Sequence, residues 1–243
     1  MHTTTTTEAA PLLGLLRLCQ LVSPALPIGA YSFSQGLESA VHAGWVQDEA
    51  SCEAWLRGIA SQGVATLDLP VLLRMHGAWR AADPEAAARW NDWLLASRET
   101  QELRYEDRQL GRALARVLVE LEIAAARPFA QPGAQPQSAA RPATDPGYAL
   151  LYSLACSHWG IAPATSAAGY LWSWLENQVL AAVKLVPLGQ SSGQRLLFQL
   201  GAAIPAWVEQ ALAIADERIG VGTVSQALAS MAHETQYARL FRS

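Results

Sequence analysis

The side chains that most often perform chemistry are widely separated in this sequence. His42, His76, His158 and His233 lie far apart along the chain, and H-E-x-x-H, G-x-S-x-G and paired C-x-x-C motifs do not occur. A tight nickel or zinc site needs several imidazole or thiolate ligands that converge on one point. The spacing does not indicate such a set, so we predict no metal site and no cofactor. His233-Glu234 is more typical of a surface or capping pair.

Two other segments have compositions that some enzymes use. Residues 189–195 (GQSSGQR) are glycine-rich, but they lack the Gly-Lys-Ser/Thr ending of a phosphate-binding P-loop. An aromatic and acidic group at close spacing consists of Tyr170, Trp172, Trp174 and Glu176. This group would suit the pocket of a small helical hydrolase or lyase. Aromatic residues at such spacing more often belong to a core, so an enzyme is the alternative interpretation.

The most unusual stretch of the chain is SPALPIGAYSFSQGLESAVHAGW, residues 23–45. Pro24 and Pro27 fix the backbone and remove donors, so a preceding helix must end before them. Gly29 is suited to a positive φ angle. A loop this constrained is either a rigid corner or a contact surface.

A new helix is expected directly after this loop. Ser32 and Gln35 match the S-x-x-Q capping box, which predicts a helix start at this point. Gly36 has no side chain and therefore allows another backbone to approach closely. We expect a helix over residues 33–43.

Three more blocks are long and compositionally unusual. They are SRETQELRYEDRQLG (97–111), SHWGIAPATSAAGYLWSWLENQVLAAVKLVPLGQSSGQRLL (157–197) and HETQYARLFRS (233–243). Together with residues 23–45 they resemble, in order and over most of the chain, the family of urease accessory protein F. That family assists nickel insertion into urease.

The resemblance implies an all-helical protein that forms a homodimer. It implies binding to a UreD/UreH-type accessory protein and recruitment of the UreG-type accessory GTPase, with the assembly docked on apo-urease. GTP hydrolysis would then be coupled to nickel delivery, with nickel handled by the complex. The chain itself would be a scaffold and regulator rather than an enzyme.

The first expected contact surface is the loop at residues 23–45. Tyr31 and Phe33 are aromatic anchors of the kind that dominate interface energetics. Helical spacing does not expose both rings on one face, so we expect Tyr31 to be the exposed one. Glu38 of the same segment is included as a partner-binding candidate.

A second expected surface is a row of arginines at i, i+4 spacing, formed by Arg104, Arg108, Arg112 and Arg116. Stacked like charges on a helix repel one another. The row is either a solvated face with local ion pairs or a surface for an acidic partner. Of the row, Arg104 and Arg108 are the partner-binding candidates.

The C-terminal block supplies the third expected surface. Tyr237 and Phe241 give it an apolar side and Arg239 gives it charge, although chain ends usually fray unless they are tied down. The block therefore docks on its own domain or becomes ordered on a partner. Lys184 precedes Pro187 near a helix end, where a cation is favourable, and it is also a partner-binding candidate.

Composition excludes some classes of partner. A net charge of -4 and a pI near 5.7 argue against nucleic acid. MHTTTTTEAAP lacks the features of a signal peptide, so we expect a cytoplasmic protein. Residues 146–175 contain no Asp, Glu, Lys or Arg. Because His158, Gly160 and Pro163 interrupt this run, two buried helices are expected there, and no membrane span.

Helical periodicity extends over nearly the whole chain, and no hairpin signal separates two alternating strands. We therefore predict an all-α fold with a single compact domain of about eight to ten helices over residues 11–243. Residues 1–10 are expected to be a disordered tail, and the Pro/Ala-rich residues 124–145 a flexible loop. The expected helices, some of which could merge, cover 12–22, 33–43, 48–66, 68–82, 84–96, 98–123, 147–159, 164–186, 190–203, 205–219 and 224–236.

Overall fold

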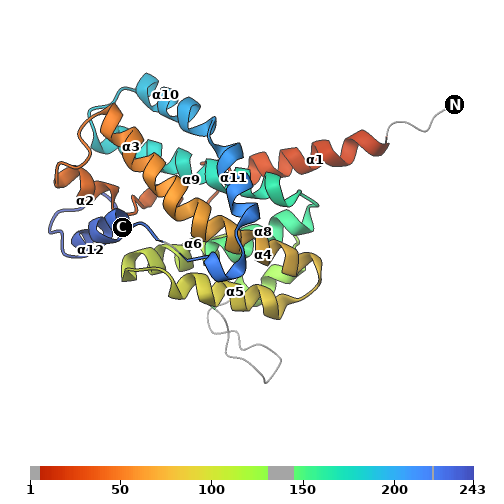
Figure 1. The fold of residues 1–243 in the computed structure, drawn as a ribbon. Helices are drawn as coiled ribbons and strands as arrows, with labels where there is room; N and C mark the ends of the chain where they lie inside the picture. Colours follow the sequence, from red (N-terminus) through yellow and green to blue (C-terminus); the bar gives the residue numbers. More distant parts are fainter. Residues whose placement is uncertain (1–5, 131–144, 221) are drawn as a thin grey trace.

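The computed structural model describes residues 6–130, 145–220 and 222–243 (Figure 1). Within these ranges every regular element is helical. The α-helices are α1 (Thr6–Leu21), α2 (Leu37–His42), α3 (Glu49–Ile59), α4 (Leu69–Arg80), α5 (Pro84–Ala96), α6 (Gln101–Glu120), α7 (Arg127–Ala130), α8 (Tyr148–His158), α9 (Pro163–Leu185), α10 (Gln190–Gly201), α11 (Ile204–Ala213) and α12 (Val224–Glu234).

The predicted all-α fold is confirmed. A π-helical stretch, Ala60–Asp68, joins α3 to α4 without a break, so the two helices expected over 48–82 form one long helix. α7 has only four residues. With α3 and α4 counted once and α7 left out, the described part of the chain has ten helices, within the expected number.

The centre of the molecule is formed by α4, α8 and α9. α5 and α8 pack on α4, α6 packs on α8, and α10 and α11 cover α9 (Figure 1). The core includes the fully buried side chains of Met75, Leu114 and Leu150. Tyr152 is also buried, and its hydroxyl donates to the carbonyl of Ser166 at 3.1 Å. Apolar side chains of all these helices therefore share one interior.

Capping explains why two helices begin where the sequence indicates. Asp83 accepts a hydrogen bond from the Ala86 amide at 2.8 Å and is followed by Pro84 at the first helical position. α6 begins after Thr100, whose hydroxyl accepts from the Leu103 amide. Because both caps use local signals, these starts are close to their predicted positions.

The predicted capping box at Ser32 and Gln35 is wrong. Ser32 lies in a short 3₁₀ turn, Ala30–Ser32, and α2 begins only at Leu37. Gln35 and Gly36 have φ angles of 54° and 85°, so the chain is left-handed directly before the helix. The Gln35 side chain donates instead to Glu106, 2.8 Å away on α6. A long-range hydrogen bond has replaced the local one.

Two predicted irregular segments are shorter than expected. α1 begins at Thr6, so residues 6–10 are helical rather than part of a disordered tail, and residues 1–5 lie outside the described part. In the loop expected at 124–145, residues 124–130 form a 3₁₀ turn and α7, and Phe129 contacts Trp79 edge-on at 6.5 Å. This contact packs the partly buried Phe129 ring against the core. Residues 131–144 lie outside the described ranges.

The uncharged run at 146–175 folds as expected into two helices, α8 and α9, which turn at Gly160 with φ 67°. A different stretch, Gln190–Ala213, is long and apolar enough to cross a membrane by length and composition alone. It consists of α10 and α11, which are separated by Ala202 and Ala203 and pack on α9. This is the pattern of a helix pair on a core.

Candidate functional site

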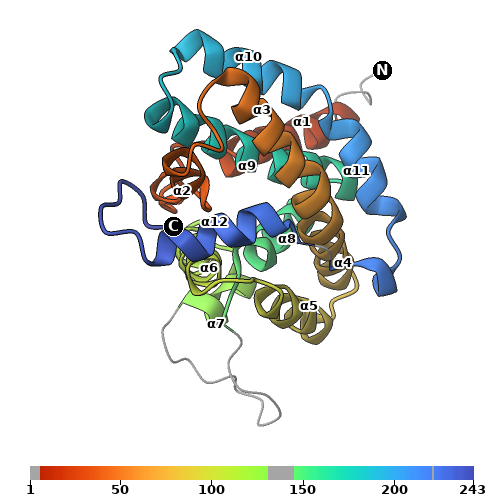
Figure 2. The same ribbon diagram turned by 60° about the vertical axis from the view of Figure 1, so that its left-hand side comes forward.

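The last residues of the chain lie against the loop that precedes α2. We call residues 235–243 the C-terminal tail. The Arg242 amide donates to the Ser32 carbonyl at 2.8 Å, and the Ser34 amide donates to the Ser243 carbonyl at 2.8 Å. Figure 2 shows α12 beside α2 and α6, with the chain end returning toward α2. The tail therefore docks on its own chain, one of the two outcomes expected.

Glu38 on α2 holds this tail through its backbone. Its Oε1 accepts from the Leu240 amide at 2.7 Å and its Oε2 accepts from the Phe241 amide at 2.9 Å. The Phe241 ring is buried, and the Lys184 ammonium lies 5.6 Å from its centroid. Hydrogen bonds to an ionised carboxylate are stronger than neutral ones, so Glu38 is a principal anchor of the tail.

A histidine connects Glu38 to α6. His233 on α12 has a side chain with no exposed surface, and its Nδ1 and Nε2 lie 2.7 Å from Glu102 and 3.3 Å from Glu38. Arg239 of the tail contacts the other oxygen of Glu102 at 2.7 Å. Two carboxylates thus face one buried ring, and Arg239 contacts one of them, so the cluster joins α2, α6, α12 and the tail.

Two further acidic side chains complete the tail's attachment. Glu234 accepts from the Gln101 and Glu102 amides, so it caps the start of α6, and this confirms the capping role expected for it. Glu106 accepts from Gln35 and from the Ser243 hydroxyl, the latter at 3.0 Å. Burial raises the pKa of Glu106 to about 7.

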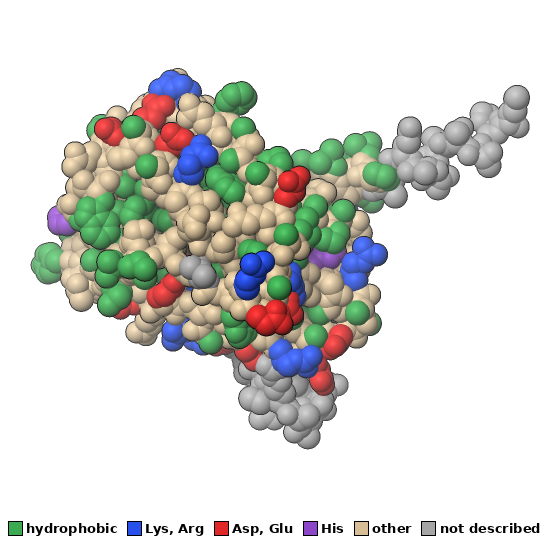
Figure 3. Space-filling view, viewed as in Figure 1, with side chains coloured by type: hydrophobic (Ala, Val, Ile, Leu, Met, Phe, Trp, Pro, Cys, Tyr) green, Lys and Arg blue, Asp and Glu red, His purple; other side chains and the backbone are tan. Residues whose placement is uncertain are grey.

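The docked tail leaves large apolar side chains in solvent. Tyr237 is fully exposed and Leu240 is 66% exposed. On α12, Leu228 and Met231 are more than half exposed. Figure 3 shows hydrophobic side chains gathered at the left of the view, over α2 and α12. A surface of this kind is typical of an interaction site.

The loop at residues 23–45 exposes only one of its two aromatic anchors. Tyr31 is 63% exposed, as expected, whereas Phe33 is 2% exposed and packs in the interior. Burial also removes Glu38 and Phe241 from the surface that the chain presents. In this chain Phe33, Glu38 and Phe241 hold the loop and the tail together, and the partner-binding role predicted for them stays a prediction.

The arginine row is not a free basic face. Arg108 and Arg112 both pair with Asp145, and an Arg104 Nη donates to the Arg98 carbonyl at 3.0 Å. Local pairing therefore accounts for most of the row, and Arg116 is its exposed member. Arg104 and Arg108 remain partner-binding candidates only through their partly exposed ends.

A cavity of about 120 Å³ lies behind the Tyr31 loop. Its lining includes the partly buried Arg98, whose guanidinium contacts Asp68 at 2.6 Å and Asp107 at 2.8 Å. Tyr170, Trp174 and Glu176 of the predicted aromatic group also line it, but Trp172 is not among the lining residues. Within the described ranges no group of three or more His, Cys, Asp or Glu residues is placed to hold a metal ion.

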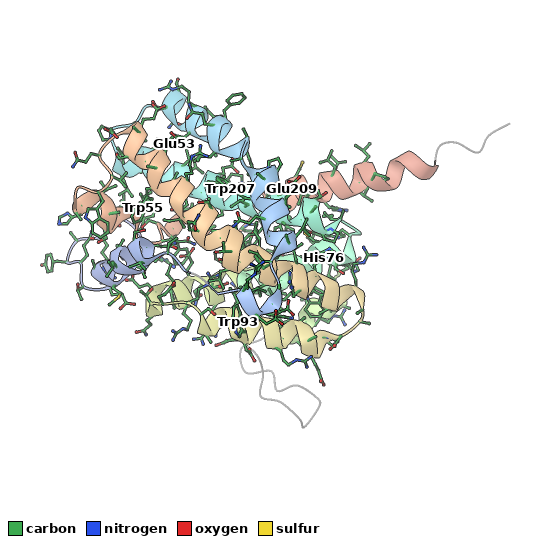
Figure 4. The ribbon with its side chains drawn as sticks, in the orientation of Figure 1. Glu53, Trp55, His76, Trp93, Trp207 and Glu209 are labelled. Atoms are coloured by element: carbon green, nitrogen blue, oxygen red, sulfur yellow. The ribbon has the colours of Figure 1, made fainter. Side chains whose placement is uncertain are left out.

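The outer helices pack by aromatic contacts away from this cavity. Figure 4 labels Trp55 on α3, Trp207 on α11 and His76 on α4. The Arg57 guanidinium lies 6.0 Å from the Trp207 ring centroid, which joins α3 to α11. His76 is buried, with Nε2 2.9 Å from the Ile161 carbonyl, and burial lowers its pKa. It is therefore a neutral core histidine.

Comparison with known proteins identifies related sequences over nearly the whole chain. The family model described as UreF matches residues 46–201. A urease accessory protein UreF from Alkalilimnicola ehrlichii is 48% identical over 239 residues, which cover 98% of this chain and 99% of that protein. A second, from Chromohalobacter salexigens, is 47% identical over 95% of each chain. A third, from Pseudoalteromonas translucida, is 44% identical over the full length of both.

The chain belongs to the UreF family of urease accessory proteins. This confirms the resemblance seen in the sequence. It also confirms the expectation of an accessory protein rather than an enzyme, because the relatives carry that name. The alternative of a small hydrolase or lyase is set aside on this ground.

In this UreF-family chain, reasoning from the sequence missed most of the polar network that holds the tail. Glu102, Glu106 and His233 were not identified as its members. Their partners lie 71 or more residues away along the chain, so no local pattern could reveal the pairs. The only local signal was the presence of large apolar residues close to the end of the sequence.

Proposed function

We propose that this chain is a scaffold and regulator in urease maturation. In this role it bridges a UreD/UreH-type accessory protein and the UreG-type accessory GTPase on apo-urease. The assembly supports GTP-dependent insertion of nickel into the urease active site, and nickel is cargo of the complex. Membership of the UreF family supports the general role, and the resemblance of four sequence blocks supports the specific partners.

One structural observation carries the proposal of a protein-binding role. The tail is fixed by hydrogen bonds to Glu38 and Glu106, yet it presents Tyr237 and Leu240 to solvent. Burial of Phe241 accounts for docking of the tail, but Tyr237 and Leu240 gain no burial from it and remain available to a partner. Tyr31 and Lys184 are exposed as well. These residues, with Arg239, form the proposed contact surface.

The proposed assembly contains two copies of this chain. α1 projects from the body and is lined with exposed hydrophobic side chains (Figures 1 and 3). Leu12, Leu13, Leu15 and Leu16 are each more than half exposed. An apolar arm of this kind supports a homodimer interface. We place the complex in the cytoplasm, with no nucleic acid or membrane partner.

Purification from cells that carry a complete urease operon tests this function. A tagged full-length chain is expected to retain the accessory proteins and apo-urease. When this chain is supplied to a strain from which its gene has been deleted, it should restore the nickel content and the activity of urease. Retention of none of these proteins, or urease that acquires nickel equally well without the chain, would contradict the proposal. The nickel content of the eluted urease is the decisive measurement.

A further inference from the structure

We propose that His233 is a proton-dependent clamp for the C-terminal tail. In its imidazolium form the ring ties Glu38 and Glu102 into the positions from which they hold the tail, and loss of the ring proton loosens residues 236–241. The proposal concerns the chain by itself and does not depend on its partners.

When both carboxylates are ionised, the hydrogen-bond geometry calls for two donors on the ring. Each ring nitrogen faces a carboxylate oxygen, at 2.7 Å for Glu102 and 3.3 Å for Glu38. An ionised carboxylate only accepts hydrogen bonds, and a neutral imidazole has one N–H. A neutral ring would therefore direct one lone pair at a carboxylate oxygen. The imidazolium form donates to both.

The charges around the ring lead to the same conclusion. Glu38 comes from α2, Glu102 from α6, and Arg239 from the tail, where it contacts Glu102. With the ring protonated, the two carboxylates balance His233 and Arg239. With the ring neutral, one negative charge remains unbalanced in a buried cluster, which is unfavourable. Glu234, on the same helix as His233, is occupied as the cap of α6.

Loss of the proton would act on the tail through both carboxylates. The Glu38 oxygen that faces His233 is the one that accepts from the Phe241 amide, and its other oxygen accepts from Leu240. Glu102 holds Arg239. The Arg242 amide bonds to Ser32 and does not depend on the cluster. We therefore expect the loosening to stop before Arg242.

Two further titratable groups contact the tail: Lys184 through the Phe241 ring, and Glu106 through the Ser243 hydroxyl. Burial raises the pKa of Glu106 to about 7. Because burial disfavours its ionised form, ionisation of Glu106 favours release of the tail, in the same direction as the proposed clamp. The Glu106→Gln variant removes this contribution and is the background in which the effect of His233 is isolated.

Nuclear magnetic resonance on the full-length, ¹⁵N-labelled chain tests the clamp between about pH 5.5 and 8.5. The ring nitrogen shifts of His233 report its protonation. Hydrogen-exchange protection factors, corrected for intrinsic pH dependence, report the tail. We expect the Leu240 and Phe241 amides to lose protection about tenfold as the ring loses its proton, the size of a lost charged hydrogen bond. Arg242 should keep its protection.

Two variants separate the clamp from a general loss of structure. His233→Gln cannot donate to both carboxylates, so the tail should be weakly protected at every pH. Glu102→Gln can donate to a neutral ring, so the tail should stay protected without a pH step. The proposal would be overturned if one ring nitrogen of His233 were unprotonated at low pH while the tail is docked. Equal protection of Leu240 and Phe241 across the range would overturn it as well.

Discussion

Gly36 and Ser230 are in backbone contact. A Cβ atom built on Gly36 would lie 2.9 Å from the Ser230 nitrogen, and Gly36 has a φ angle of 85°. α2 and α12 therefore meet at a point where only glycine fits, directly beside the network that holds the tail. Gly36→Ala should lower the free energy of unfolding by roughly 2 kcal/mol or more, because it combines a left-handed backbone with a steric clash. Thermal unfolding measures the change.

Gly77 provides the matched control for this substitution. It lies inside α4, and a Cβ there would meet nothing within 4 Å. Gly77→Ala should stabilise the chain by about 0.5–1 kcal/mol through helix propensity. Similar unfolding temperatures for both alanine variants would show that the contact with Ser230 is not tight.

The sequence predicted those structural features that are determined by residues adjacent in the sequence. Asp83 before Pro84 marked the start of α5, and the close approach at Gly36 followed from the absence of a side chain. The helix start at Ser32 was predicted wrongly because Gln35 contacts α6 instead of its own backbone. A capping box is a local preference of about 1 kcal/mol, so a buried tertiary hydrogen bond can override it.

The tail network could not be predicted in this way. Glu38 holds amides 202 and 203 residues further along the chain, and His233 reaches Glu102 across 131 residues. Such pairs are created by the packing of α12 between α2 and α6, not by spacing in the sequence. Tyr31 is exposed as expected, although its segment forms a 3₁₀ turn and not the α-helix on which that expectation was based.

Glu106 predicts a pH-dependent stability. Its folded pKa is about 7, above the ordinary value of 4.5, because the carboxyl is buried. The folded state therefore binds the proton more tightly than the unfolded state. This contribution to stability is fully present below about pH 4.5 and is lost as the pH rises through about 7. The resulting decrease in the free energy of unfolding is at most roughly 3 kcal/mol.

Glu106→Gln should remove the decrease in stability at high pH, because an amide does not ionise. The Ser243 hydroxyl can rotate to accept from the new amide, so the tail stays attached. We expect the variant to be more stable than the unmodified chain at pH 8.5, with little difference at pH 5. Denaturant titrations at both pH values measure this, and the exposed Glu120→Gln serves as the control. If Glu106→Gln were less stable than the unmodified chain at pH 8.5, this would contradict the raised pKa of Glu106.

Neighbouring tail residues should differ sharply in their effect on stability. Phe241 is 5% exposed and Leu240 is 66% exposed. Phe241→Ala should lower the free energy of unfolding by about 3 kcal/mol through a cavity in the core. Leu240→Ala should change it by less than about 0.5 kcal/mol. Calorimetry of both variants checks this contrast, and equal effects would show that the tail is not docked.

Deletion of residues 233–243 should lower the stability of the chain as well as remove the tail. It removes the Phe241 side chain from the core and the Glu234 cap from α6. Loss of partner binding in such a deletion would not by itself identify a contact surface. Single exposed residues give a clearer test.

The exposed leucines of α1 predict an effect on oligomeric state. Replacing Leu12 and Leu16 together with Glu places two charges on the proposed dimer surface, and both positions are more than half exposed. In size-exclusion chromatography and light scattering the double variant should behave as a monomer. Its circular dichroism should show unchanged helicity. The exposed Gln20→Glu on the same helix should remain a dimer. A double variant that stays dimeric would place the interface elsewhere.

Tyr31 and Phe33 separate binding from folding in one loop. Tyr31 is 63% exposed, so Tyr31→Ala should change the unfolding temperature little and weaken retention of the accessory proteins about tenfold, the effect of removing a typical aromatic anchor. Phe33 is 2% exposed, so Phe33→Ala should cost about 3 kcal/mol of stability. Quantitative pull-downs at equal chain concentration, with melting curves beside them, measure both. Tyr31→Ala that retains partners normally would remove this loop from the contact surface and leave Tyr237 as its principal aromatic residue.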